Sequence, residues 1–386
     1  MGSYSKNFWV LCFSMFLFMA SFNLIIPELN QFITLLGGSN HKGLIITLFT
    51  ISAAISRPFS GKLSDTIGRK KSMFIGMLVT TLVSLLYPLS VSIVFFLCLR
   101  FLHGFSAGFY PTGATALLTD IVPENKRGQA MGIWGTFISL GIGVGQGTGS
   151  LISNSIGINN LFIIASGVSL MSGILITNIK ETLEYPIKFE TQLLKLKFQD
   201  IFEPCVMPAA IVMFLSATCS GIIFVLTPEI SNFLKIENKG WFFIFYVMTT
   251  IIVRLFFSSI SDKIGRRKTL TIGMIFLLVS MGLIGFSKDI FSYTLASIIF
   301  GIATGTTSPT LFAWTADLSH PERRGIGSGT MFIALELGIM VGSLSTLITY
   351  NNTLTSIPIA FLVGSVMALI AITYLIWHQY NRKSMT

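Results

Sequence analysis

Charged side chains are scarce in this sequence. Only 11% of its 386 residues are Asp, Glu, Lys or Arg, whereas soluble domains carry about 25%. Hydrophobic residues make up 52% of the chain, so the charges are too few to cover a water-exposed surface. This composition excludes a cytosolic enzyme, a disordered chain and a small secreted domain held together by disulfides.

Cysteine and histidine are also sparse. The four cysteines lie within apolar runs and lack the spacing of metal ligands, which is typical of small apolar side chains. The four histidines are scattered, and no nucleophile or phosphate-binding motif accompanies them. We therefore expect no cofactor and no enzymatic activity. A membrane-embedded enzyme or a receptor that does not transport is kept only as a distant alternative.

Long apolar runs are what the chain has in abundance. A helix needs about 20 mostly apolar residues to cross a bilayer, and twelve such runs occur. They cover residues 8–27, 43–61, 72–90, 92–117, 130–153, 160–179, 205–228, 240–260, 270–287, 290–316, 327–350 and 356–378. Residues 8–26 could instead form a signal peptide, since Lys6 precedes them, but the run is long for one and eleven similar runs follow.

The distribution of positive charge predicts the orientation. With the N-terminus placed inside, the outward connections hold only four of the 26 Lys and Arg residues, and the inward connections hold most of the others. This is the positive-inside bias of membrane proteins, and it explains most of the net charge of +10 without a nucleic-acid partner. We expect a multi-pass protein of the cell (inner) membrane, surrounded by lipid, with both termini in the cytoplasm.

An internal repeat relates the two halves of the chain. Adding 197 to a position in the first half reaches a matching residue in the second: Asp65 becomes Asp262, and Asp120 becomes Asp317. The matches include charged and glycine residues of loops, so chance agreement between apolar segments does not explain them. Parallel repeats of this kind place a substrate site between the halves, near the membrane midplane.

The repeat and the spans together define the expected architecture. We expect an all-α membrane protein whose twelve transmembrane helices form two pseudo-symmetric six-helix bundles. The bundles would comprise residues 1–182 and 204–386, joined by a cytoplasmic linker over residues 183–203.

Residues 61–71 carry the pattern by which a family is identified. Their sequence, GKLSDTIGRKK, resembles the G-x-L-x-D-x-x-G-R-[KR]-x signature of the major facilitator superfamily, and residues 258–268 repeat it without the first glycine. Arg100 and Gly104 in the fourth span are similar to the family's R-x-x-x-G motif. The resemblance covers essentially the whole chain and implies a transporter that works by alternating access.

The motif supplies candidate gating residues. Gly68 would allow a tight turn, and Asp65 could accept hydrogen bonds from Arg69 or face a helix N-terminus. The resemblance implies that this aspartate pairs across the two halves and favours the outward-open state; a basic loop that only sets topology is the simpler alternative, and both can hold. The candidates are Gly61, Asp65, Gly68, Arg69, Asp262, Gly265 and Arg266.

Charged residues inside spans are costly in a bilayer and are therefore candidates for substrate or proton coupling. Arg100 lies too deep in its span for the guanidinium to reach water easily, and neither Arg100 nor Glu336 has a charged counterpart in the repeat. Because arginine stays protonated, a buried carboxylate such as Glu336 would carry the proton.

Three further titratable residues lie in or near the spans. Glu28 and Glu229 each follow a proline at an outer helix end, so we expect them to be wetter than Glu336. His103 shares a helical face with Arg100, although a lone histidine in a span is as often a packed polar group. Of these three, Glu28 and His103 join Arg100 and Glu336 as coupling candidates.

Glycine is concentrated in the fifth span. Gly141, Gly145 and Gly149 recur at every fourth residue, a spacing that lets neighbouring helices approach closely. The segment resembles the family's antiporter motif, G-x-x-x-G-P-x-x-G, but Gln146 stands where that motif has proline. We expect close helix packing here, and the departure weakens the antiporter interpretation.

These patterns together favour a secondary active transporter. We interpret the chain as a monomeric exporter that loads a small molecule from the cytoplasm and is driven by the proton motive force, as the resemblance to drug and metabolite exporters implies. The alternative is a proton-coupled uptake symporter for a sugar, an organic acid or a peptide, since the same scaffold could serve either direction.

Overall fold

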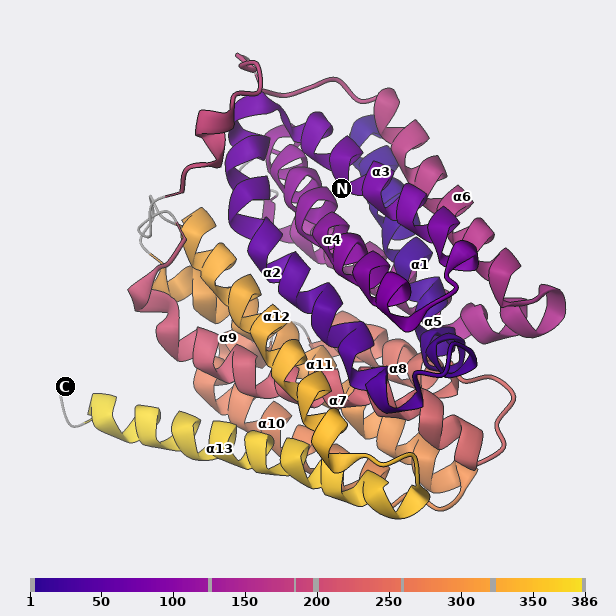
Figure 1. Cartoon of the computed structure of the whole chain (residues 1–386). Helices are drawn as coiled ribbons and strands as arrows, with labels where there is room; N and C mark the ends of the chain where they lie inside the picture. Colours follow the sequence, from indigo (N-terminus) through magenta and orange to yellow (C-terminus); the bar gives the residue numbers. More distant parts are fainter. Residues whose placement is uncertain are drawn as a thin grey trace. The chain divides into compact units, whose positions relative to one another are not determined.

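The computed structural model describes residues 4–123, 127–183, 185–196, 201–257, 260–319 and 324–383. At 127–129, 257, 260, 262, 324–325 and 380–383 only the backbone is described. Every regular element within these ranges is a helix (Figure 1). A helix lies at each of the twelve expected spans, which confirms the all-α class.

The first six helices follow the first six expected spans. They are α1 (Lys6–Leu35), α2 (Lys42–Ile67), α3 (Arg69–Leu86), α4 (Ile93–Ile121), α5 (Arg127–Ile156) and α6 (Ile158–Thr177). Short 3-10 turns lie before α2 and α4, and another lies in the segment that follows α6: η1 (Ser39–His41), η2 (Tyr87–Leu89) and η4 (Thr191–Leu194).

The second half repeats this order. Its helices are α7 (Met207–Phe233), α8 (Trp241–Phe257), α9 (Ile260–Ile264), α10 (Arg266–Gly285), α11 (Ile290–Leu318), α12 (Arg324–Thr349) and α13 (Ile357–Lys383). The 3-10 turns η6 (Pro204–Val206) and η8 (Leu354–Ser356) precede α7 and α13. The five residues of α9 correspond in the repeat to the last turn of α2, so α9 is not an additional span.

Ten helices of the described chain are long and apolar enough to cross a membrane. Of the other two spans, α8 is apolar over Trp241–Phe256 but shorter, and α5 has glycines among its apolar residues. In lipid a helix satisfies all backbone hydrogen bonds within one segment, which explains why these apolar runs fold as helices and not as strands.

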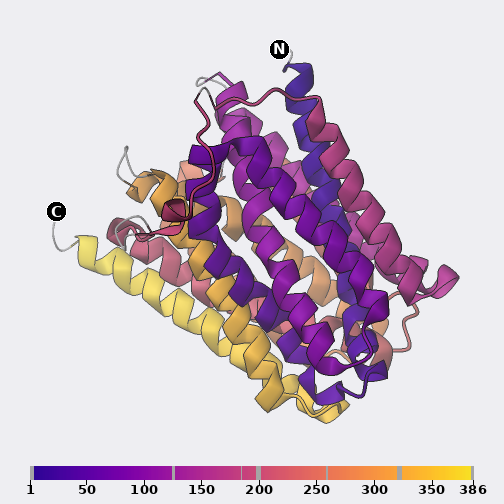
Figure 2. The same cartoon turned by 45° about the horizontal axis from the view of Figure 1, so that its top comes forward.

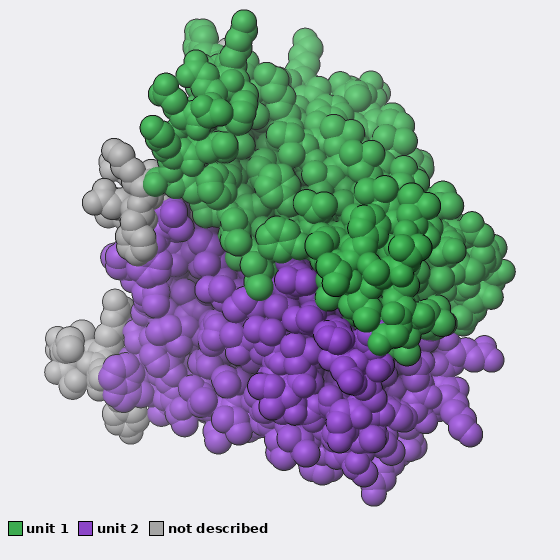
Figure 3. Space-filling model, viewed as in Figure 1, with its two compact units in different colours: residues 1–37, 51–197 green, residues 38–50, 198–386 purple. Residues whose placement is uncertain are grey.

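The chain forms two compact units (Figure 3). Unit 1 comprises residues 1–37 and 51–197, and unit 2 comprises residues 38–50 and 198–386. The boundary therefore falls within α2, whose first nine residues are counted with unit 2 and whose remainder is counted with unit 1.

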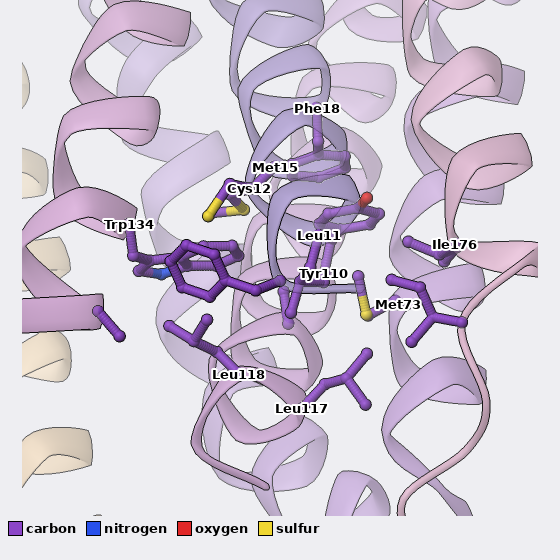
Figure 4. Packing of buried hydrophobic residues seen from close by; sticks show 14 of the residues in the cluster. Leu11, Cys12, Met15, Phe18, Met73, Tyr110, Leu117, Leu118, Trp134 and Ile176 are labelled. Atoms are coloured by element: carbon purple, nitrogen blue, oxygen red, sulfur yellow. The ribbon is translucent and has the colours of Figure 1, made fainter. Parts of the chain in front are cut away.

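In unit 1, α1 packs most extensively against α5 and α6 (Figure 2), and α3 packs against α4 and α6. An apolar cluster of this unit lies around the first half of α1 (Figure 4). There the ring of Phe18 stacks on that of Tyr110, with centroids 3.9 Å apart, and the Tyr110 hydroxyl is hydrogen bonded to Ser14. The cluster joins α1 to α4 through buried side chains from both helices.

Unit 2 has the same pairing of helices as unit 1. There α7 packs against α12 and α13, while α10 packs against α11 and α13. The repeat extends to helix starts: Ser92 caps α4 by accepting from Phe95 N at 3.2 Å, and Asp289, its match at +197, caps α11 by accepting from Ser292 N at 2.9 Å. The two six-span halves therefore share the same pairing of helices and similar helix caps.

Candidate functional site

The loop between α2 and α3 is the first candidate region of unit 1. Gly68 has a φ of +127°, which glycine adopts readily and other residues only with strain. From the first position of α3, Arg69 Nη1 donates to the Asp65 carboxylate and, at 2.9 Å, to the carbonyl of Ser64. Arg69 Nε also donates to Asp120 Oδ2 at 3.2 Å. One guanidinium thus ties the ends of α2 and α4 to the start of α3.

The second-half echo has a closely similar arrangement in unit 2. Gly265 has a φ of +90°. Arg266 Nε donates to Asp317 Oδ2 at 3.0 Å, and its Nη1 donates to Ser261 Oγ at 2.6 Å. The side chain of Asp262 lies outside the described residues. The two arginine–aspartate pairs are related by the offset of 197, so each unit has its own ion pair that links neighbouring helices.

A carboxylate that follows α6 caps the start of α3. Glu181 accepts hydrogen bonds from the backbone N–H groups of Arg69 at 3.1 Å and Lys70 at 3.0 Å. Negative charge is favoured at this position because the first N–H groups of a helix have no partner within it. A Cβ at Gly68 would lie 2.6 Å from the Glu181 carboxylate, so the glycine also leaves room for the cap.

Asp120 and Glu181 were not among the residues that the sequence identified as functional. The match of Asp120 with Asp317 in the repeat is a signal that could have identified the first. Glu181 carries no such signal, because it reaches α3 only in the folded chain. Gly61, which the motif includes, has no atom within 4 Å of the place where a Cβ would lie, so packing in this structure does not require glycine there.

The three glycines of α5 face α1, a partner helix that the sequence did not identify. A Cβ at Gly141 would lie 2.5 Å from the carbonyl oxygen of Phe16, and one at Gly145 would lie 2.7 Å from that of Ala20. A Cβ at Gly149 would lie closer still to the carbonyl of Leu24. The backbones of α1 and α5 are thus in direct contact over about two turns.

Two polar pairs cross the same interface between α1 and α5. Gln146, which replaces the proline of the antiporter motif, donates from Nε2 to Asn23 Oδ1 at 2.9 Å. Ser150 Oγ donates to Glu28 Oε1 at 2.7 Å. Hydrogen bonds between buried polar groups offset the cost of removing those groups from water, so these pairs fix the register of α1 on α5.

Glu28 and Glu229 are as buried as Glu336, which corrects the expectation that they are wetter than that residue. Glu28 has no exposed surface and Glu229 is 7% exposed. The expectation assumed that the helices end near the prolines, but α1 continues to Leu35 and α7 continues to Phe233. Both carboxylates therefore lie inside helices, where neighbouring helices cover them.

In unit 2, Glu229 belongs to a buried ion pair that the sequence did not predict. Lys42 Nζ lies 2.8 Å from Glu229 Oε2 and 2.9 Å from Asn352 Oδ1. The Tyr350 hydroxyl donates to the same carboxylate oxygen at 3.2 Å. Burial and the adjacent Glu229 carboxylate raise the pKa of the Tyr350 phenol, which therefore stays protonated as a donor. This network joins the start of α2 to α7 and to the segment after α12.

Glu336 lies within α12 and is 6% exposed. Two residues further along, Gly338 packs directly on the backbone of α7 at Phe214, so this stretch of α12 adjoins the core of unit 2. The structure therefore places the carboxylate in a largely buried part of a membrane-spanning helix, where a charge is costly.

Arg100 and His103 meet in unit 1 around a tyrosine that the sequence did not single out. Arg100 is 2% exposed, and its Nη1 donates to the Tyr87 hydroxyl at 3.2 Å. The same hydroxyl lies 3.0 Å from Nδ1 of His103. Tyr87 lies in η2, before α4, so the α3–α4 connection supplies the group that meets the buried guanidinium.

The chain matches the Major Facilitator Superfamily over residues 11–237 and 206–384. It is 25% identical over 392 residues to the quinolone resistance protein NorA of Staphylococcus aureus (strain COL), covering 98% of each chain. It is 28% identical over 326 residues to the multi-drug resistance efflux pump PmrA of Streptococcus pneumoniae (strain R6), covering 80% of each.

Two further similarities are narrower or concern the fold alone. Multidrug resistance protein 2 of Bacillus subtilis (strain 168) is 34% identical over 169 residues, which are 43% of this chain and 42% of that protein. The crystal structure of the human organic anion transporter MFSD10 (TETRAN) superposes with a TM-score of 0.73 at 18% identity, over 96% of this chain and 100% of that one.

Proposed function

Because this chain belongs to the major facilitator superfamily of membrane transporters, we propose that it exports drug-like small molecules from the cytoplasm in exchange for protons. The observation that supports export over uptake is the match to NorA and PmrA over most of their length. Both names describe resistance or efflux, and the similarity to NorA extends over nearly the whole of both chains.

Buried carboxylates support the proposed coupling to protons. Glu28 in unit 1 and Glu336 in unit 2 are both largely excluded from water. A carboxylate in such a place is costly when ionised and is therefore suited to bind a proton at one stage of a cycle and release it at another. Glu229 is less suited to this task because it is paired with Lys42.

We further propose that the transporter acts as a monomer in the cell membrane with both termini in the cytoplasm. The charge bias of the connections supports this orientation, since basic loops are retained on the cytoplasmic side. A protease-protection assay of terminal tags on intact cells tests it: tags digested without permeabilisation would overturn the orientation.

A growth screen against a panel of toxic compounds, followed by flux measurements in inverted vesicles, tests the function. Export predicts that an imposed pH gradient, acid inside these vesicles, drives a compound into them. Uptake symport predicts that the same gradient drives a compound out. Absence of gradient-dependent movement of any compound that the protein protects against would refute the proposal.

Neutral variants of the two carboxylates separate coupling from binding. Glu28→Gln and Glu336→Gln keep the side-chain shape, and we expect at least one of them to lose gradient-driven flux while still exchanging substrate down its own gradient. Glu190→Gln, at an exposed carboxylate of the segment after α6, is the matched control and should behave like the unmodified protein. If both buried variants retain gradient-driven flux, neither carboxylate carries the coupling proton.

A further inference from the structure

The buried cluster of Arg100, Tyr87 and His103 has a defined direction of hydrogen bonding. A guanidinium only donates hydrogen bonds, so Arg100 Nη1 is the donor and the Tyr87 oxygen the acceptor in the 3.2 Å contact. The phenol then needs an acceptor for its own proton, and the contact at 3.0 Å is Nδ1 of His103. Tyr87 and His103 have no exposed surface, so this contact is shielded from bulk water.

This direction assigns the protonation of the imidazole. If Tyr87 donates to Nδ1, that nitrogen must be unprotonated, and the ring proton of a neutral histidine lies on Nε2. A proton on Nδ1 would compete with the phenol proton for the same short contact. It would also create a second positive charge near the Arg100 guanidinium, in a place where one charge is already costly.

Aromatic packing holds the tyrosine in position. The ring of Tyr87 contacts Phe162 with centroids 5.0 Å apart and Phe96 with centroids 5.5 Å apart. Tyr87 is thereby fixed by rings from α4 and α6, so its hydroxyl forms a rigid anchor for the guanidinium of Arg100. Rigid anchoring of this kind keeps a functional side chain in one geometry.

We infer that Tyr87 and His103 are positioning residues for Arg100, and that His103 acts as a fixed hydrogen-bond acceptor and does not carry the transported proton. Arg100 donates to Tyr87, and Tyr87 donates to His103. These two consecutive hydrogen bonds fix the orientation of the guanidinium group. The effect of these residues on flux rests on the proposed function, whereas the protonation of His103 does not.

Transport by four variants tests the positioning role. Tyr87→Phe keeps the ring and removes the hydroxyl, and His103→Leu removes the acceptor; each should lower flux by about tenfold, and together by no more than either alone. His103→Asn keeps an acceptor near the position of Nδ1 and should restore most of the flux with an unchanged pH profile. Tyr293→Phe removes the hydroxyl of another fully buried tyrosine, which donates to Thr227 O at 2.8 Å, and controls for a general loss of stability.

The outcomes distinguish a hydrogen-bond acceptor from a carrier of the transported proton. If His103→Asn loses gradient-driven flux or shifts the pH profile, His103 carries the proton and the inference is wrong. If Tyr87→Phe and Tyr293→Phe reduce flux equally, the hydroxyl of Tyr87 has no special role and the inference also fails.

Nitrogen NMR of histidine-labelled protein tests the assignment independently of any substrate. The His103 signal is identified by its loss in His103→Asn, and we expect an unprotonated Nδ1 and a protonated Nε2 throughout the range from about pH 5 to 8. Tyr87→Phe should change the Nδ1 signal, while Tyr293→Phe should not. Titration of His103 in this range, or a proton on Nδ1, would overturn the inference even if the protein transports nothing in the screen. The expected spectrum without any flux would instead refute the proposed function alone.

Discussion

Replacing Gly145 by alanine tests the direct contact between α1 and α5. The new methyl group would lie 2.7 Å from the carbonyl oxygen of Ala20 and 2.9 Å from the Cβ of Asn23. Both neighbours belong to the rigid part of α1, so no flexible side chain can move aside. The variant can fold only if the two helices separate or bend, which loosens the packing around them.

Two opposing effects set the magnitude. Alanine is favoured over glycine within a helix by about 1 kcal/mol, whereas overpacking of a tight interface costs about 1–3 kcal/mol. The control is Gly135→Ala in the same helix, where no atom lies within 4 Å of the new methyl group, so only the favourable effect applies. We expect the free energy of unfolding of the two variants to differ by about 1–3 kcal/mol.

Thermal unfolding of the purified protein in detergent, followed by tryptophan fluorescence, measures this difference. The unfolding temperature should be at or above that of the unmodified protein for Gly135→Ala and below it for Gly145→Ala. Gly149→Ala should be at least as damaging, because its methyl group would approach the Leu24 carbonyl even more closely. If Gly145→Ala is as stable as Gly135→Ala, α1 and α5 are not in the close contact described.

Charged contacts in both units give three further tests. Lys42→Met leaves the buried Glu229 carboxylate without its ammonium partner and should lower the free energy of unfolding by about 3–5 kcal/mol. The double variant Lys42→Met, Glu229→Leu should recover much of this loss. A double variant as unstable as the single one would contradict the pairing. Glu181→Gln should weaken the cap of α3 by about 0.5–1 kcal/mol and speed hydrogen exchange in its first turn; unchanged exchange would rule out the cap. Asp120→Asn and Asp317→Asn should each cost less than about 1 kcal/mol, because the pairs are partly exposed. A clearly larger loss of stability on unfolding in either variant would contradict this.

The fold could be predicted from the sequence because a bilayer permits few solutions. An apolar run of about 20 residues has to form a helix in lipid, and the offset of 197 relates the two halves even where their apolar residues differ. The ends of the helices were less predictable. Hydropathy falls at Glu28, yet α1 continues beyond it, since a helix end depends on capping and tertiary contacts as well as on composition.

The candidate site was predictable only where it follows a motif or a spacing. The glycines of α5 recur at every fourth residue, so the face that meets another helix could be read directly. Tyr87, Glu181 and the partner of Glu229 could not be found in this way, because each contact joins residues of different elements, between 13 and 187 positions apart. Such contacts depend on how the helices pack, which no local pattern encodes.

Gln146 in place of proline also affects how α5 can bend. A proline there would remove a backbone N–H and push the preceding turn away, which makes a kink; with glutamine, α5 has no proline anywhere between Arg127 and Ile156. Other spans do contain one, including Pro111 in α4 and Pro309 in α11. Bending during a transport cycle should therefore concentrate in the helices that contain a proline, whereas α5, which contains none, should stay straight.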